Sequence, residues 1–124
     1  MMKKKVMIFD DDADILELCS ILLKSRGCIV HTRGHCRDII STVSELEPHI
    51  IFMDNKIPDM GGIAASQLLK SDEKLRKIPL IFFSANTNVE QLSREAMADD
   101  YLKKPFNISE LEEMVEKYSI KEDA

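Results

Sequence analysis

Short apolar runs and amphipathic stretches alternate five times along the chain. The apolar runs are typical of strands and cover residues 6–9, 28–32, 50–53, 80–83 and 101–102. In the stretches between them, apolar residues recur every three or four positions, which is the spacing of one helix face. This pattern predicts helices over residues 13–26, 39–46, 63–69, 89–97 and 108–118.

The third and fourth runs, IIFM and LIFF, are apolar at every position. A strand that is apolar on both faces is typical of a parallel sheet covered by helices on both sides. Strict alternation of strand and helix favours the same arrangement. Gly27 is expected to end the first helix, and Asn107 with Glu110 three residues later is a capping pair for the last. The sequence therefore predicts an α/β fold.

The composition limits the classes of protein to be considered. The chain has 124 residues, a size that predicts one domain over residues 1–124, and its net charge is −5. A negative charge disfavours nucleic-acid or anionic-membrane binding, which basic surfaces drive. No apolar run approaches the ~20 residues of a membrane span, so we expect a cytoplasmic protein. The acidic end, residues 121–124, is expected to be frayed.

Three cysteines without a secretory signal predict free thiols in a reducing compartment. Cys28, His31, His35 and Cys36 are close enough in sequence for a zinc site to be considered. Residues three apart on a strand point to opposite faces, and neighbours on a helix diverge. The spacing therefore disfavours a zinc site.

Polar residues follow the predicted strands wherever a strand ends. They are Asp10, Asp11 and Asp12 after the first strand, Asp54 after the third, Ser84 after the fourth, and Lys103, Lys104 and Pro105 after the fifth. Parallel strands all end at one edge of a sheet, where open α/β sheets bind ligands. Clustered carboxylates repel one another unless a cation joins them, and oxygen ligands in a wet site favour Mg²⁺. With a lysine and a hydroxyl beside them, they are the parts needed for phosphoryl transfer to Asp54.

These motifs resemble the receiver domain of bacterial two-component response regulators from about residue 4 to residue 118. The matching segments are FDDD at 9–12, MDNKIPDMGG at 53–62, FSA at 83–85 and YLKKPF at 101–106. The resemblance implies a doubly wound, flavodoxin-like (βα)5 fold with a five-stranded parallel sheet in the order 2-1-3-4-5. It also implies a signalling domain of a phosphorelay that accepts a phosphoryl group, and not an enzyme.

The resemblance assigns roles to individual residues of this chain. Asp54 is the phosphorylated residue, and the ion is Mg²⁺, with Mn²⁺ as an alternative. The groups expected at the metal are the carboxylates of Asp11 and Asp54, the backbone carbonyl of Lys56, and Asp10 through water. The residues expected to contact the phosphoryl group or to switch are Ser84, Ala85, Lys104 and Tyr101. The bond from Lys104 to Pro105 is expected to be cis, and Asp12 is expected to cap a helix.

Partners follow from the same resemblance. A sensor histidine kinase or a histidine phosphotransfer protein is expected to supply the phosphoryl group. The fourth helix, fifth strand and fifth helix are expected to form the face that binds a downstream protein or a second copy. Two departures from the family pattern stand out. Met97-Ala98 occupies a place where Gly-Ala is usual, and Lys56 puts a cation beside the phosphoryl site.

A phosphatase of the haloacid dehalogenase-like class is the main alternative. Its signature would use Asp10 and Asp12, Ser84, Lys104 and the late pair Asp99-Asp100. In that signature Gly-Thr should follow the second aspartate, but Ala13 and Asp14 stand there in this chain. Asp54 would also have no role in such a phosphatase. A flavodoxin-like cofactor module is disfavoured too, because carboxylates in its first loop would repel a phosphate.

Overall fold

The computed structural model describes residues 3–118, so the expectation for residues 121–124 lies outside the described part. In chain order the elements are β1 (Lys5–Phe9), α1 (Ala13–Lys24), β2 (Ile29–Arg33), α2 (Ile39–Leu46), β3 (Ile50–Asp54), α3 (Gly62–Ser71), the 3₁₀ turn η1 (Leu75–Lys77), β4 (Leu80–Ser84), α4 (Val89–Glu95), β5 (Asp100–Lys103) and α5 (Ile108–Tyr118). Between residues 3 and 118, no helix has the length and apolar character to cross a bilayer.

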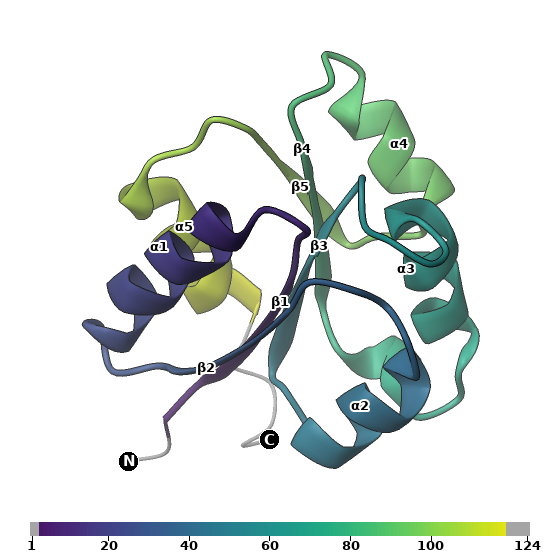
Figure 1. Cartoon of the computed structure of the whole chain (residues 1–124), viewed down its shortest axis with the longest axis horizontal. Helices are drawn as coiled ribbons and strands as arrows, with labels where there is room; N and C mark the ends of the chain where they lie inside the picture. The colour runs from purple at the N-terminus through teal and green to yellow at the C-terminus, as the bar shows by residue number, and fades with distance from the viewer. Residues whose placement is uncertain (1–2, 119–124) are drawn as a thin grey trace.

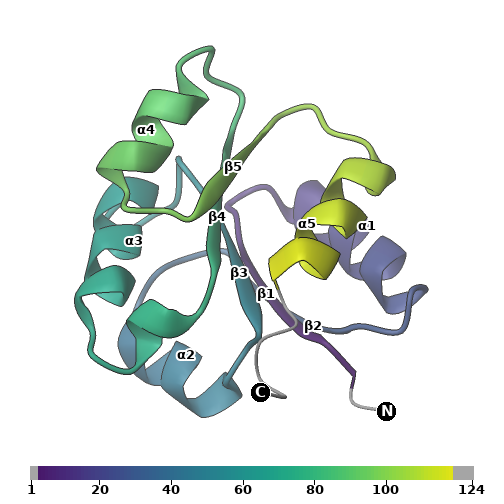
Figure 2. The same ribbon diagram turned by 180° about the vertical axis from the view of Figure 1, so that it is seen from behind.

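The five strands form one sheet in the order β2-β1-β3-β4-β5. Each neighbouring pair is parallel. Helices α1 and α5 cover one face of the sheet, and α2, α3 and α4 cover the other (Figures 1 and 2). The predicted doubly wound α/β fold and its strand order are therefore confirmed.

Two apolar clusters, one on each face of the sheet, form the core. Successive residues of β3 and β4 belong to different clusters: Met53 packs toward α2, α3 and α4, whereas Phe52 packs toward α1 and α5. Every residue of β3 and of β4 is buried. This two-sided burial explains why the IIFM and LIFF runs lack the alternation of a half-exposed strand.

The predicted helix caps are present. The side chain of Asp12 accepts hydrogen bonds from the backbone amides of Asp14 and Ile15 at the start of α1. Asn107 and Glu110 exchange side chain-to-backbone hydrogen bonds of 2.9 Å in both directions, which is a complete capping box for α5.

Some predicted boundaries differ from the structure. Helix α1 ends at Lys24, two residues before the predicted end, and β2 begins at Ile29 instead of Cys28. Arg26 and Gly27 close a tight turn through hydrogen bonds to the last carbonyls of α1, and Gly27 has a φ of +90°. His35 and Cys36 lie in the loop before α2, not on a helix.

The prediction that Met97 belongs to the apolar stripe of the fourth helix was wrong. Helix α4 ends at Glu95, and Met97 has a φ of +63° and a side chain that is 51% exposed. The amide of Ala98 donates to the carbonyl of Ser93, and that of Met97 donates to Arg94. These two bonds form a Schellman motif, whose left-handed position usually holds glycine.

We therefore expect Met97→Gly to raise the free energy of unfolding by about 1 kcal/mol. The substitution removes the steric cost of a β-carbon at positive φ, and the Met97 side chain makes little buried contact that would be lost. Chemical denaturation followed by circular dichroism measures the change. Met97→Ala is the matched control, because it truncates the side chain but keeps the β-carbon. An equal gain for both variants would show that the backbone conformation is not the cause.

Candidate functional site

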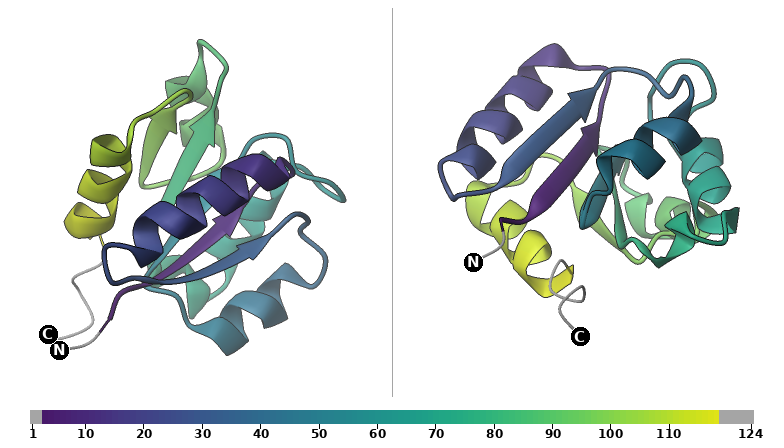
Figure 3. Two further views of the ribbon diagram at one scale, coloured as in Figure 1. Left: turned by 60° about the vertical axis from the view of Figure 1, so that its left-hand side comes forward. Right: turned by 90° about the horizontal axis from the view of Figure 1, so that it is seen from below.

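The carboxyl ends of the strands place the predicted residues at one edge of the sheet. Asp10 and Asp11 follow β1, Asp54 is the last residue of β3, and Ser84 is the last residue of β4. Lys104 follows β5 directly, and its amide donates to the carbonyl of Ser84 across the gap between the strands. Figure 3 shows the strands from two further sides, with the connections to the following helices leaving from this edge.

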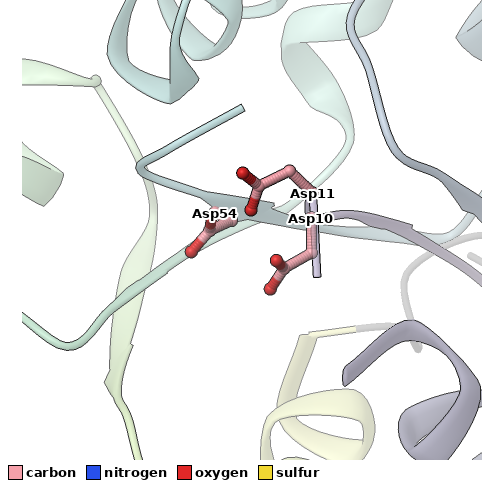
Figure 4. Close-up of side chains that lie close together, drawn as sticks. All are labelled: Asp10, Asp11 and Asp54. Carbon is pink, nitrogen blue, oxygen red and sulfur yellow. The ribbon is translucent and has the colours of Figure 1, made fainter. Parts of the chain in front are cut away.

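Three carboxylates converge at this edge. One oxygen each from Asp10, Asp11 and Asp54 lies within 4.8 Å of the others, close enough to hold one metal ion. Figure 4 shows the three side chains gathered in one place, with Asp54 on a different segment from the other two. Asp10 is fully buried and Asp54 is 5% exposed, whereas Asp11 is open to solvent. The cluster therefore has two buried acids and one that faces water.

Lys104 supplies the positive charge within the cluster. Its Nζ lies 2.8 Å from Oδ2 of Asp10 and 2.8 Å from Oδ1 of Asp54. The same ammonium lies 4.8 Å from the centre of the Phe83 ring, within the range of a cation–π contact. Burial alone would lower the pKa of Lys104, but its hydrogen bonds to both carboxylates and their negative charges together raise that pKa. Lys104 is therefore protonated at neutral pH.

The negative charge of Asp54 is less well stabilised by its neighbours than the positive charge of Lys104. Burial raises the pKa of its carboxyl, and the charge of Asp10 adds to the rise. The hydrogen bond from Lys104 and that from the backbone amide of Lys56, 3.2 Å from Oδ2, offset only part of this effect. One ammonium is shared between two acids, so the site has an excess of negative charge that a further cation would relieve.

A cleft of about 180 Å³ opens over the three carboxylates. Ser84 is 3% exposed at its wall, and its Oγ accepts a hydrogen bond of 3.1 Å from the amide of Asn86. The lining residues are Asp10, Asp11, Asp12, Asp54, Asn55, Lys56, Ser84, Ala85, Asn86 and Lys104. Every predicted metal and phosphoryl residue therefore borders one cleft.

Two predicted residues lie outside this lining. Tyr101 is half-buried in β5, opposite Phe82, and packs against the apolar cluster beneath α2, α3 and α4. Pro105 follows Lys104 through a cis peptide bond. Tyr101 is thus separate from the cleft, on the strand that directly precedes Lys104.

Three contacts of the site were not anticipated from the sequence. Phe83 lies beneath the Lys104 ammonium, but in the LIFF run it is indistinguishable from a core residue. The amide of Asn86 holds the Ser84 hydroxyl, and its position two residues after that serine was the available signal. Asp10 was expected to act on the metal through water, but it is also a direct ion-pair partner of Lys104.

The late acidic pair of the phosphatase alternative lies elsewhere. Asp99 and Asp100 stand at the start of β5, the opposite end of that strand from Lys104. The Asp99 carboxylate accepts hydrogen bonds from Nζ of Lys70 at 2.6 Å and from the amide of Leu80 at 2.8 Å. Asp99 therefore ties the start of β5 to β4 and α3, and neither residue of the pair lines the cleft.

Comparison with known proteins agrees with this geometry. A family model described as the response regulator receiver domain matches residues 6–116. The DNA-binding response regulator MtrA of Mycolicibacterium paratuberculosis is 31% identical over 112 residues, which cover 89% of this chain and 48% of MtrA. The chain thus spans about half the length of that relative. Protein PilG of Pseudomonas aeruginosa is 32% identical over 109 residues, covering 86% of this chain and 81% of PilG.

A solved structure gives the same fold. It is the receiver domain of the sensor histidine kinase PA1611 from Pseudomonas aeruginosa PAO1, described with a magnesium ion coordinated in its active site cleft. It superposes with a TM-score of 0.86 at 22% identity, over 94% of this chain and 98% of that one. The chain belongs to the response regulator receiver domain family, and so is a signalling domain of two-component systems and not a phosphatase.

Proposed function

We propose that Asp54 is the phosphoacceptor of this receiver domain and that a divalent cation, Mg²⁺ in the first place, is required for the transfer. The observation that carries the proposal is the convergence of three carboxylates around one lysine in an open cleft. Asp54 belongs to this group and lies at the end of a strand that is buried throughout. A rigid strand end fixes the position of the attacking oxygen.

In the transfer, a carboxylate oxygen of Asp54 forms a bond to phosphorus as the bond from phosphorus to the donor atom breaks. The leaving group departs with the electron pair of that bond, and the product is an acyl phosphate. Lys104, which is protonated beside Asp54, offers its charge to the phosphoryl oxygens. Ser84, at the wall of the same cleft, can donate a hydrogen bond from its hydroxyl group to one of those oxygens.

The metal-binding roles proposed for Asp10 and Asp11 agree with their exposure and with the hydrogen bonds that they already accept. Both oxygens of Asp10 are engaged, Oδ1 by the amide of Asp12 at 2.9 Å and Oδ2 by Lys104. Asp11 is exposed and holds neither of these partners. This difference favours Asp11 as a direct ligand and a water-mediated role for Asp10. Both oxygens of Asp54 also accept hydrogen bonds, so its direct ligation, like that by the backbone carbonyl of Lys56, is inferred from the resemblance to receiver domains. When bound, Mg²⁺ would neutralise charge on the phosphoryl oxygens; Mn²⁺ has the same ligand preference.

Neutralising Asp11 should weaken Mg²⁺ binding far more than neutralising its neighbour Asp12. We expect Asp11→Asn to lose at least about tenfold in Mg²⁺ affinity, since it removes a direct carboxylate ligand. Asp12→Asn removes the same charge one residue away and keeps a side chain that caps helices equally well. Isothermal titration with MgCl₂ compares the two. Equal losses would mean that overall charge, and not ligation by Asp11, governs metal binding.

Receiver domains of response regulators interact with histidine kinases. For this chain we infer a sensor histidine kinase or a histidine phosphotransfer protein as the donor, acting in the cytoplasm on a single receiver domain of residues 1–124. A phosphoryl oxygen would offer Ser84 a charged acceptor and draw its loop inward, and Tyr101 would then fill the vacated space. The face made by α4, β5 and α5 would then bind a downstream protein or a second copy.

Phosphorylation by a small donor tests the proposal. Incubation with acetyl phosphate and MgCl₂ should add one phosphoryl group, which reductive labelling and peptide mass spectrometry should place on Asp54. A chelator should prevent the addition. Labelling that persists without divalent cations, or that maps to another residue of the cleft, would overturn the assignment.

A further inference from the structure

Helix α3 holds the end of α4 through one side chain. Nε2 of Gln67 donates a hydrogen bond of 2.7 Å to the backbone carbonyl of Glu95, the last residue of α4. Carbonyls in the last turn of a helix have no partner within that helix. The bond therefore satisfies a carbonyl that α4 itself cannot satisfy, and it joins two helices that lie side by side on one face of the sheet (Figures 1 and 2).

The α3 side of this contact is fixed to the site. Gly62, the first residue of α3, packs so closely that a β-carbon there would lie 2.0 Å from the backbone carbonyl oxygen of Asp54. Its amide also donates to the carbonyl of Asn55 at 2.9 Å. Further along α3, Ala65 and Leu69 are buried in the core. Gln67 thus projects from a helix whose start rests directly on the Asp54 strand.

The α4 side of this contact combines a buried residue, Ala96, with exposed neighbours. The helix has seven residues, and it ends in the strained turn at Met97. Glu95 and Met97 both expose their side chains to solvent. A short helix with a strained, exposed end gains little from its own hydrogen bonds. The contact with Gln67 therefore acts together with the burial of Ala96 and the backbone hydrogen bonds of the turn in holding the end of α4 in place.

We propose that Gln67 is a positioning residue of the switch: it latches the C-terminal turn of α4 in the unphosphorylated arrangement and must release it when α4 moves. The inference rests on the proposed phosphorylation of Asp54. The bond is one of the contacts that hold α4 against α3 in the arrangement described here, so a shift of α4 relative to α3 must break it. If activation shifts α4 against the fixed α3, the bond is lost, and its strength opposes activation.

Removing the latch should therefore make activation easier. In Gln67→Leu, the beryllofluoride concentration at half-saturation, with MgCl₂ present, should fall by about 2- to 10-fold, the range of one net hydrogen bond. Without beryllofluoride, the amide NMR signals of residues 93–98 should already move toward their positions in the activated wild type. Gln91→Leu makes the same change at an exposed α4 position for which the structure gives no hydrogen bond, and it should match the wild type.

Two readouts separate the ways in which the idea can fail. Amides of the loop after Asp54, at residues 55 and 56, report binding at the site, and those of residues 93–98 report α4. A wild type in which neither set responds to beryllofluoride would refute the role of Asp54, and the latch with it. A normal response with an unchanged half-saturation in Gln67→Leu, or an equal change in Gln91→Leu, would refute the latch alone.

Discussion

Asp54→Asn protein is expected to take up no phosphoryl group from acetyl phosphate and, without metal at neutral pH, to be more stable than the wild type. The first effect follows because an amide is a far poorer nucleophile than a carboxylate. The second follows because burial raises the pKa of Asp54, so its charged form is disfavoured in the folded state. Asparagine has the same shape and keeps an oxygen that can accept the hydrogen bond from Lys104.

The pH dependence distinguishes this explanation from a general charge effect. A carboxyl whose pKa is raised on folding favours the folded state below its unfolded pKa, and this advantage is lost as the pH rises through the folded pKa. The gain from Asp54→Asn should therefore be largest near neutral pH and shrink on acidification through the Asp54 pKa. Thermal melts from acid to neutral pH measure it. Glu45→Gln, an exposed acid on α2, is the control for net charge and should show no such trend.

Addition of MgCl₂ gives a second check on the same variant. The wild-type melting temperature should rise with Mg²⁺, because a ligand that binds only the folded state stabilises it. The rise should be smaller in Asp54→Asn, which lacks one carboxylate ligand. An Asp54→Asn protein that is less stable than the wild type at every pH would show that the carboxylate cluster is not strained.

The fold could be predicted from the sequence because its strongest signals are local. Runs such as LIFF lie in strands covered on both faces, and the spacing of apolar residues on α5 matches the face that packs on the sheet. The match is incomplete on α1, where Leu18 of the predicted apolar stripe is 55% exposed. The end of a helix could not be predicted where a turn without glycine determines it. Met97 continues the apolar spacing of α4, yet the helix ends before it in a Schellman turn that normally signals itself with glycine.

The membership of the site could be predicted because parallel strands all end at one edge. Asp54 and Lys104, 50 residues apart, needed only the topology to meet. How the charges are shared could not be predicted. That Lys104 bridges two acids depends on side-chain geometry, as does the contact of its ammonium with Phe83. The bond from Gln67 to Glu95 likewise joins two exposed positions, for which no periodic pattern gives a signal.

Lys104→Met should lower the free energy of unfolding at neutral pH by about 3 kcal/mol, the lower end of the range for breaking a buried ion pair. Methionine keeps most of the aliphatic stem, so the loss reflects mainly the charge. Asp10 and Asp54 would be left as two buried carboxylates without a cation. The pKa of Lys104 is raised, so its contribution is fully present below the ordinary lysine pKa and disappears only at strongly alkaline pH.

The loss of unfolding free energy caused by Lys104→Met should become smaller on acidification, because protonation of Asp10 and Asp54 removes their repulsion.

Combining Lys104→Met with Asp54→Asn measures how much of this loss depends on the ion pair with Asp54. If the ion pairs dominate, Lys104→Met should cost about 1–3 kcal/mol less in the Asp54→Asn background than in the wild type, because only Asp10 then remains without its partner. Urea denaturation of the four proteins gives this coupling energy. Additivity within about 0.5 kcal/mol would mean that Lys104 stabilises the domain without coupling to Asp54, through Asp10 or through the contact of its ammonium with Phe83.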